Sequence, residues 1–175
     1  MKSSNLQQQV EAQILSSYSS LYRLAFVYVK NPDDAMDVVQ ESVYRAIHGA
    51  LGVRNADAIG SWLRRIVVNT ALDFLRQRSR ETPSDHLPET GCWEDRYPDV
   101  DVLSALDILD LRERSVVVLR FFEDQKLQDI AGILEENENT VKTILYRSLK
   151  KLKIELTKGE SNRERKPSGR TETGI

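Results

Sequence analysis

Apolar residues recur at three- and four-residue spacing along most of this chain, which is the spacing of one face of an α-helix. The pattern predicts one group of helices between residues 10 and 80 and a second group between 102 and 158. A polar stretch at 81–101 separates the groups, and a polar tail at 159–175 is expected to be disordered. We therefore expect an all-α protein with two small helical domains, an N-terminal one of three to four helices and a C-terminal one of four.

The end of the second group has the pattern of a helix-turn-helix. A short helix is predicted at 127–134, with Glu135 and Glu136 in the turn that follows. Asn137 is suited to cap the next helix, and Glu138 suits the positive end of its dipole. The buried faces of the two helices are expected to consist of Ile130, Ala131 and Leu134 in the first and Val141, Leu145, Leu149, Leu152 and Leu156 in the second.

The opposite face of the second helix is polar and basic. Between 139 and 158 the chain has six basic residues and one acid. A helix packed on the core with a merely solvated lysine-rich face is the simpler interpretation, but this imbalance favours a recognition helix in the DNA major groove. The side chains expected to contact phosphates and base edges are Lys142, Thr143, Tyr146, Arg147 and Lys150.

Three helices are predicted in the N-terminal domain. The first should end near Pro32, with Asp33 capping the second and the third running from about 57 to 78. The third helix is basic outside its apolar face, with five arginines against Asp73 between 61 and 80. The apolar faces of the first two helices comprise Ile14, Tyr18, Leu21 and Ala25, then Ala35, Val38, Val39, Val43, Ala46 and Ile47.

Composition restricts where nucleic acid could bind. The net charge is −2 and the pI is near 5.8, so any DNA-binding surface must be a local patch. The stretch 81–101 has three prolines and seven acids against Arg96, which predicts an acidic, flexible linker. The single cysteine, Cys92, fits a reducing compartment, and no membrane-length apolar run or signal peptide is evident. We expect a cytoplasmic protein without membrane insertion.

No group of residues suggests catalysis. His48 and His86 are isolated, and the chain has no glycine-rich phosphate loop. Four carboxylates lie between 33 and 41 with no basic residue among them, but no histidine is near and helical spacing spreads them apart. We therefore expect no enzyme activity, no cofactor, no metal and no small-molecule substrate.

Several runs of this sequence resemble the sigma factors of bacterial RNA polymerase. The run NPDDAMDVVQES at 31–42 is similar to the second conserved region of that family, and SWLRRIVVNTALDFLR at 61–76 is similar to its segment that reads the −10 promoter element. Residues 114–122, Ile130, Ala131 and the run NTVKTILYRSL at 139–149 are similar to the fourth conserved region. The short chain resembles the extracytoplasmic-function group, with region 2 at 10–80 and region 4 at 102–158.

The resemblance implies specific roles. Asp37, Gln40 and Glu41 would contact the clamp helices of the polymerase β′ subunit, and region 4 would contact the β flap. The melted −10 strand would be bound by Asn69, which with the loop 49–58 forms a pocket for a flipped base, and by Arg64, Arg65 and Arg76, which hold phosphates. Asn139 and Thr140 would join the recognition helix at the −35 duplex. An anti-sigma factor, in some members held at the membrane, is a further implied partner.

The sequence departs from the family at two points. Asp110 stands where members often have proline, but Asp110 and Glu113 have the spacing of a capping box that would still start the helix. Glu135 stands where the turn often has glycine, so a left-handed backbone there would be strained.

Two other classes remain open from the residues alone. A DNA-binding activator would explain 127–156 equally well, but it would not explain the run at 61–76 or the acidic helix before it. An interaction adaptor built of helical modules would bind no DNA. Co-purification with core polymerase distinguishes the sigma factor from both other classes. The promoters, the regulon and the inducing signal are not encoded in any recognisable pattern of the sequence.

Overall fold

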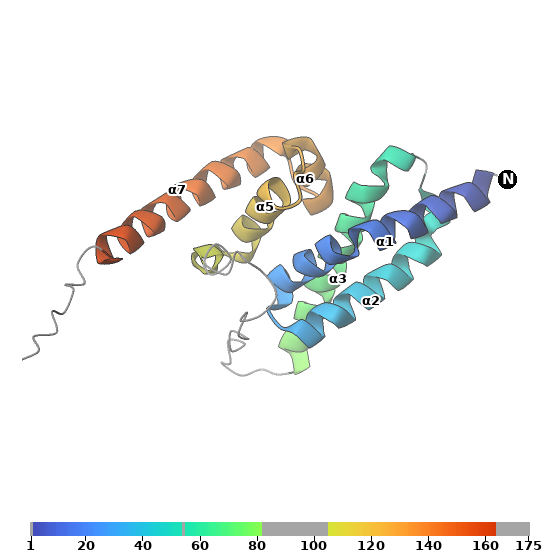
Figure 1. The fold of residues 1–175 in the computed structure, drawn as a ribbon, viewed down its shortest axis with the longest axis horizontal. Helices are drawn as coiled ribbons and strands as arrows, with labels where there is room; N and C mark the ends of the chain where they lie inside the picture. The colour runs from blue at the N-terminus through green and yellow to red at the C-terminus, as the bar shows by residue number, and fades with distance from the viewer. Residues whose placement is uncertain (1, 54, 82–104, 164–175) are drawn as a thin grey trace, which may run out of the picture.

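The computed structural model describes residues 2–53, 55–81 and 105–163, and every regular element in them is helical, as predicted. The predicted linker after Glu81, with Cys92, and the tail from 164 lie outside the described residues. The N-terminal unit comprises α1 (Lys2–Val29), α2 (Pro32–Gly49), η1 (Ala50–Gly52), η2 (Ala56–Ala58) and α3 (Ile59–Glu81) (Figure 1). The C-terminal unit comprises η3 (Leu106–Ile108), α5 (Leu111–Phe121), α6 (Leu127–Leu134) and α7 (Glu138–Arg163).

The start of α2 differs from the prediction by two residues. Asn31, not Asp33, is the N-cap, and its side chain accepts hydrogen bonds from the backbone amides of Asp33 and Asp34 at 2.9 and 3.0 Å. Pro32 takes the first helical position, where its missing N–H costs nothing. Asp33 and Asp34 then lie in the first turn, where acids suit the helix dipole.

The core of the N-terminal unit lies where α1, α2 and α3 meet. Two residues predicted to be on its apolar faces are exposed instead, Tyr18 at 37% and Ile47 at 39%. Tyr18 contacts Met36 of α2, with 3.2 Å between its hydroxyl and the sulfur. The buried residues of the unit include Ile14, Leu21, Leu24, Ala25, Ala35, Val38, Val39, Ala46, Leu63, Val67, Val68 and Ala71.

The first helix of the helix-turn-helix has the predicted bounds, and the second begins where predicted. α6 spans Leu127–Leu134, and α7 begins at Glu138 with the Asn137 side chain accepting from the Asn139 amide at 2.8 Å. α7 continues to Arg163, past residue 159 where the tail was predicted to begin. A single glycine inside a helix costs only about 1 kcal/mol, so Gly159 does not end one that is already formed.

The turn between α6 and α7 is left-handed although it lacks glycine. Glu135, the C-cap of α6, has φ 56° and ψ 42°. Its backbone amide donates to Ala131, and the Glu136 amide also donates to the Ala131 carbonyl at 2.9 Å. Glu135 therefore adopts the left-handed conformation in which strain was expected. The two amide bonds to Ala131 end the helix in the usual way.

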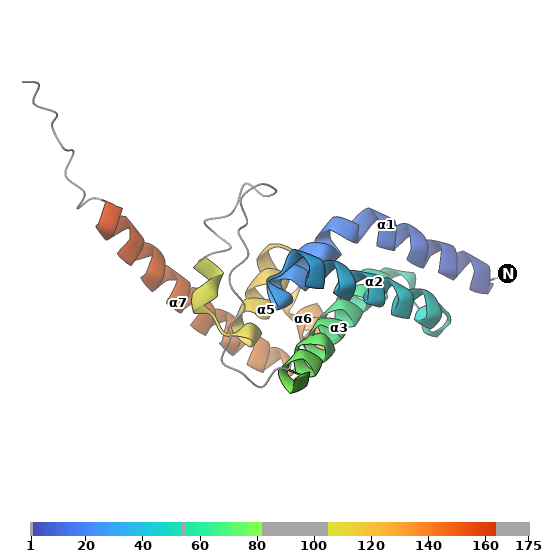
Figure 2. The same cartoon turned by 90° about the horizontal axis from the view of Figure 1, so that it is seen from below.

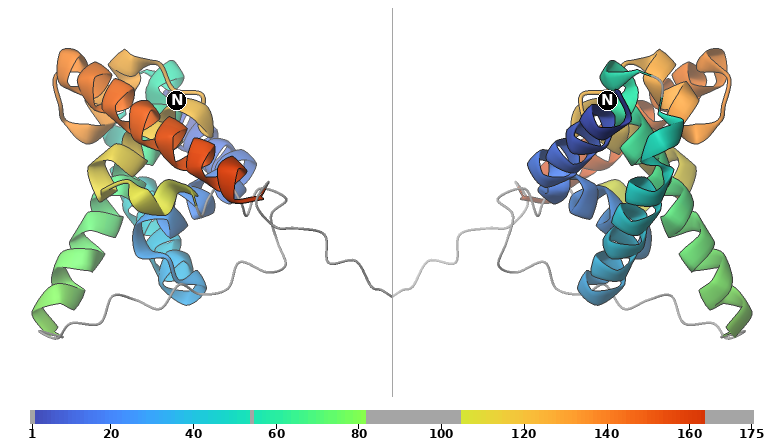
Figure 3. Two further views of the ribbon diagram at one scale, coloured as in Figure 1. Left: turned by 90° about the vertical axis from the view of Figure 1, so that its left-hand side faces the viewer. Right: turned by 90° about the vertical axis from the view of Figure 1, so that its right-hand side faces the viewer.

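The two units are packed against each other. α1 contacts α5 and α3 contacts α6, so the C-terminal unit lies across the N-terminal three-helix bundle (Figures 1 and 2). The end of α7 extends away from the bundle (Figure 2). α7 and α2 face opposite sides of the molecule (Figure 3), which leaves both helices with an uncovered outer face.

Candidate nucleic-acid interface

α7 has one buried face and one exposed polar face, as its periodicity predicts. Val141 and Leu145 are buried at 0% and 8% exposure, and Leu149 and Leu152 are half-buried. The side chain of Leu156 lies outside the described residues. The predicted outer residues Lys142, Thr143, Tyr146, Arg147 and Lys150 are all exposed.

A groove opens at the first turns of α7. It has a volume of about 360 Å³ and is lined by Arg112, Asn139, Thr140, Thr143, Ile144 and Arg147. Arg112 comes from α5, and an ion pair with Glu136 holds it at this edge. The sequence reasoning missed Arg112, because nothing local shows that the start of α5 lies beside the start of α7.

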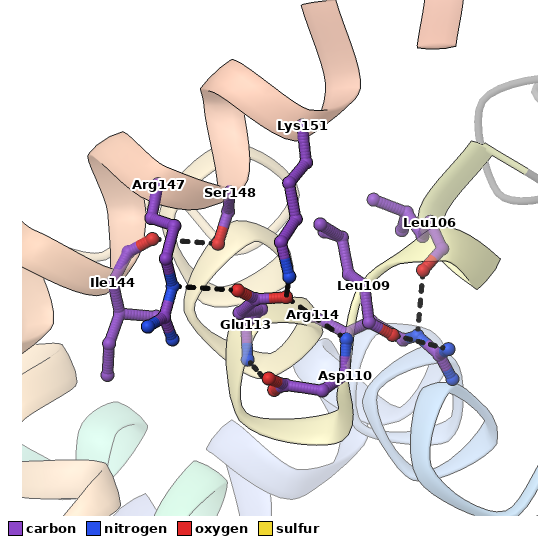
Figure 4. A network of polar contacts seen from close by, with 9 residues as sticks. All are labelled: Leu106, Leu109, Asp110, Glu113, Arg114, Ile144, Arg147, Ser148 and Lys151. Atoms are coloured by element: carbon purple, nitrogen blue, oxygen red, sulfur yellow. Dashed lines mark hydrogen bonds and ion pairs between the residues drawn. The ribbon is translucent and has the colours of Figure 1, made fainter. Parts of the chain in front are cut away.

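Arg147 and Lys151 converge on one buried carboxylate that the sequence reasoning assigned only to helix capping. Glu113 accepts a hydrogen bond from Nε of Arg147 at 2.9 Å and from Nζ of Lys151 at 2.8 Å (Figure 4). It also completes the predicted capping box with Asp110. Burial raises the pKa of the Glu113 carboxyl, but hydrogen bonds from Lys151 and the Asp110 amide outweigh burial and leave the pKa below its ordinary value.

The acidic residues of α2 are partly neutralised by bases from outside the acidic run. Glu41 accepts from Arg45 at 2.8 Å, and Asp34 pairs with Arg78 of α3. The hydrogen bond with Glu41 raises the pKa of Arg45. Asp37 and Gln40 are exposed, with no side-chain partner among the described residues.

The arginines of α3 are not equally accessible. Arg64 is 15% exposed and donates from Nε to Glu123 at 3.0 Å, and Arg65 pairs with Glu135. Both carboxylates belong to the C-terminal unit. Two of the four residues predicted to bind the −10 strand are therefore engaged in ion pairs between the units. Arg76 is exposed, and its one ion pair among the described residues is with Asp73, at 3.2 Å on the same helix.

Glu123 is a buried carboxylate at the contact between the units. Its side chain is 1% exposed, and it accepts hydrogen bonds from Ser20 and Arg64. Arg23 of α1 lies 3.9 Å from its other oxygen, and in the described part of the chain neither that oxygen nor Nε of Arg23 has a hydrogen-bond partner. A single acid of the C-terminal unit thus faces two arginines of the N-terminal unit.

Asn69 is exposed on α3, which is what both a solvated residue and a base-reading residue require. No hydrogen bond joins it to the described part of the loop at 49–53 and 55–58. Trp62, seven residues before it, packs near Gly49, where a Cβ would lie 3.3 Å from the indole ring. The loop also exposes Leu51 at 73%.

The described residues contain no cluster of histidine, cysteine and acids that could hold a metal ion. In the same part of the chain, none of the helices combines the length and apolar character that crossing a membrane requires.

Comparison with protein families assigns both units. Residues 14–81 match Sigma-70 region 2, and residues 99–152 match Sigma-70, region 4. The chain is 51% identical over 140 residues to RNA polymerase sigma factor SigV of Bacillus subtilis, covering 78% of this chain and 84% of that protein. It is 34% identical over 139 residues to ECF RNA polymerase sigma factor SigM of Mycobacterium tuberculosis, covering 77% and 70%.

Solved structures share the fold. The sigma factor RpoE of Bartonella quintana, in complex with the anti-sigma factor NepR, superposes with a TM-score of 0.71 at 20% identity and covers 84% of this chain and 96% of its own. CnrH, in complex with the cytosolic domain of CnrY, gives 0.65 at 23% identity, covering 89% and 92%. From the two family regions in this order and the identity to curated members, the chain belongs to the extracytoplasmic-function group of sigma-70 factors, non-enzymatic proteins that direct promoter-specific initiation by RNA polymerase.

Proposed function

We propose that the chain divides promoter recognition between its units, with the outer face of α7 on the −35 duplex and α3 on the melted −10 strand. The observation that supports this most strongly is the two-faced α7, on which buried Val141 and Leu145 fix the orientation of the exposed donors. A helix whose buried face is fixed in this way presents its exposed side chains to the DNA major groove in a fixed orientation. The contacts on the −35 duplex are Asn139, Thr140, Lys142, Thr143, Tyr146, Arg147 and Lys150.

The −10 strand is bound by Asn69, Arg64, Arg65 and Arg76 of α3. Asn69 and the loop 49–58 take up a flipped base, and the arginines hold strand phosphates. Arg64 and Arg65 become available only when the C-terminal unit moves away, because Glu123 and Glu135 hold them in this structure. The units therefore separate when holoenzyme binds the promoter.

The exposed side of α2 binds core polymerase at the β′ clamp helices. Asp37 and Gln40 are free for this contact, and the bond from Arg45 orients Glu41. The C-terminal unit contacts the β flap. An anti-sigma factor is a further partner in the cytoplasm, an inference supported by the RpoE structure, which contains the anti-sigma factor NepR.

Run-off transcription with purified core polymerase on genomic templates tests this function. The wild-type chain should produce discrete transcripts that core enzyme alone does not make. Three variants should give fewer transcripts on the same templates. Asp37→Lys should fail to bind core polymerase, Asn69→Ala should fail to open the promoter, and Lys142→Ala should fail to bind the −35 duplex. A chain that binds promoter DNA strongly but never associates with core enzyme would contradict the proposal.

A further inference from the structure

The carboxylate of Glu113 is enclosed between α5 and α7. Its side chain is 0% exposed, although glutamate is rarely buried so fully without a partner. Three groups compensate it, namely Arg147 at 2.9 Å, Lys151 at 2.8 Å and the Asp110 amide at 3.2 Å. Because a buried charge is costly to leave unpaired, the carboxylate fixes the positions of both cations on α7.

Both cations nevertheless reach the surface. The side chain of Arg147 is 58% exposed and that of Lys151 is 45% exposed. Arg147 uses Nε for Glu113, and its two terminal nitrogens have no partner among the described residues. Figure 4 shows these nitrogens turned away from the carboxylate, beside Ile144. The guanidinium is therefore held on its inner side and open on its outer side.

The outer side of Arg147 lines the groove at the start of α7. The same groove is lined by Arg112 of α5 and by Asn139 and Thr140 of α7, which supply a second guanidinium, an amide and a hydroxyl. Of the described residues, no acid lines this groove, although Glu136 pairs with Arg112 at its edge. Two guanidinium groups and neutral donors around an open groove match a phosphate, which an arginine can bind with two parallel hydrogen bonds.

We propose that Glu113 is a positioning residue that holds Arg147 so that its terminal nitrogens bind a backbone phosphate of the −35 duplex, together with Arg112 of the same groove. This rests on the proposed −35 binding by α7. Arg147 then positions the protein along the DNA backbone and does not read a base. Phosphate contacts carry no sequence information, whereas contacts to base edges do. This arrangement also adds Arg112 of α5 to the DNA-binding surface, and it gives the buried Glu113 the role of positioning Arg147.

The affinity of the full-length chain for a short duplex tests this, measured by fluorescence anisotropy over a salt series. The duplex carries the −35 element of a promoter that the wild type uses in run-off transcription, and a second duplex has that element scrambled. Arg147→Ala should weaken binding to both duplexes by about tenfold and lower the salt slope by about one. Arg112→Ala should act in the same way with a smaller loss.

A double-mutant cycle separates positioning from support of the fold. Glu113→Gln should weaken binding between about twofold and tenfold in the wild-type background and have no further effect beside Arg147→Ala. Arg147→Lys is the matched variant, because lysine can still pair with Glu113 but lacks the paired terminal nitrogens. Its melting temperature should stay near that of the wild type while its affinity falls.

Each other result overturns the proposal. An equal loss on Glu113→Gln with and without Arg147 would make Glu113 only a structural link between α5 and α7. Tighter binding by Glu113→Gln would mean that the carboxylate restrains the cations, and a loss confined to the unscrambled duplex would mean that Arg147 reads a base. A wild-type chain that binds neither duplex would instead refute the −35 function itself, and the cycle would then show no DNA effect of any variant.

Discussion

Arg64 and Glu123, which are 59 residues apart in the sequence, form a 3.0 Å ion pair that joins the two helical units. Glu123 is almost wholly buried and Arg64 is mostly buried, so water screens the pair poorly. Replacing one member of such a pair leaves the other charge without compensation. Glu123→Gln should therefore weaken the contact between the units by about 3 kcal/mol. Fluorescence energy transfer between labels on α2 and α7 would report the increased separation.

The matched control for this experiment is Glu135→Gln. Glu135 also pairs with an arginine of α3, but both side chains are about half exposed, at 60% and 48%. Exposed pairs of this kind contribute about 0.5 kcal/mol or less. Energy transfer in Glu135→Gln should match the wild type. An equal separation of the units in both variants would contradict the role assigned to the buried carboxylate of Glu123.

Glu113 should make stability depend on pH in the acid range. Its folded-state pKa lies below the ordinary value of 4.5, because hydrogen bonds from Lys151 and the Asp110 amide outweigh burial. A depressed pKa stabilises the folded state above the unfolded pKa, and this contribution is lost as pH falls through the folded value. Urea unfolding should show the largest difference between wild type and Glu113→Gln near neutral pH, with the two converging below about pH 4.5. A constant difference down to the acid limit would rule out this ionisation.

Local patterns account for the elements of this fold and for the faces of α7. The bounds of α6, the Asn137 cap and the Asp110–Glu113 capping box depend on residues within a few positions of each other. The start of α2 was misplaced because two polar residues flank Pro32 and either can cap a helix. Pro32 suits the first helical position, which makes the preceding Asn31 the cap.

Contacts between distant residues could not be predicted in the same way. Charged residues are normally exposed, so nothing in the sequence marks Glu113 or Glu123 as buried. Their burial comes from packing α5 on α7 and the C-terminal unit on α1 and α3. The pairing of Arg65 with a residue 70 positions away likewise depends on the arrangement of the units. The exposed face of α7 could be predicted from the sequence, but the buried carboxylates that pair with its cations and with those of α3 could not.

Lys142→Ala should weaken −35 binding through lost charge alone. Lys142 is exposed on the outer face of α7, and no described residue forms a salt bridge with it. Removing one phosphate contact should lower the salt slope of duplex binding by about one, to the same extent for different sequences. Arg80→Ala, which removes an exposed charge from α3, is the control and should leave the slope unchanged. A change of sequence preference in Lys142→Ala would indicate a base contact instead.

Charge reversal at Asp37 and Glu41 should separate polymerase binding from DNA binding. Both side chains are exposed, and the Glu41–Arg45 pair is worth only about 0.5 kcal/mol, so folding should change little. The double variant should compete poorly with the wild type for core polymerase and retain its affinity for the −35 duplex. Glu11→Lys, an exposed reversal on α1, is the control. Undiminished competition by a folded double variant would exclude this face of α2.

Asn69→Ala should impair promoter opening without affecting −35 binding, because Asn69 lies on α3 and the −35 residues lie on α7. Asn69 has no hydrogen-bond partner among the described residues, so its replacement should not alter the stability of α3. If its amide pairs with a flipped base, the loss should be about 1 kcal/mol, or about fivefold in affinity for single-stranded −10 DNA. Permanganate footprinting of the melted region measures the opening within holoenzyme, the state in which we propose that Arg64 and Arg65 leave their carboxylates. Opening at the wild-type rate would show that Asn69 is only a solvated residue, and the pocket would have to be formed by other side chains of α3 and the loop.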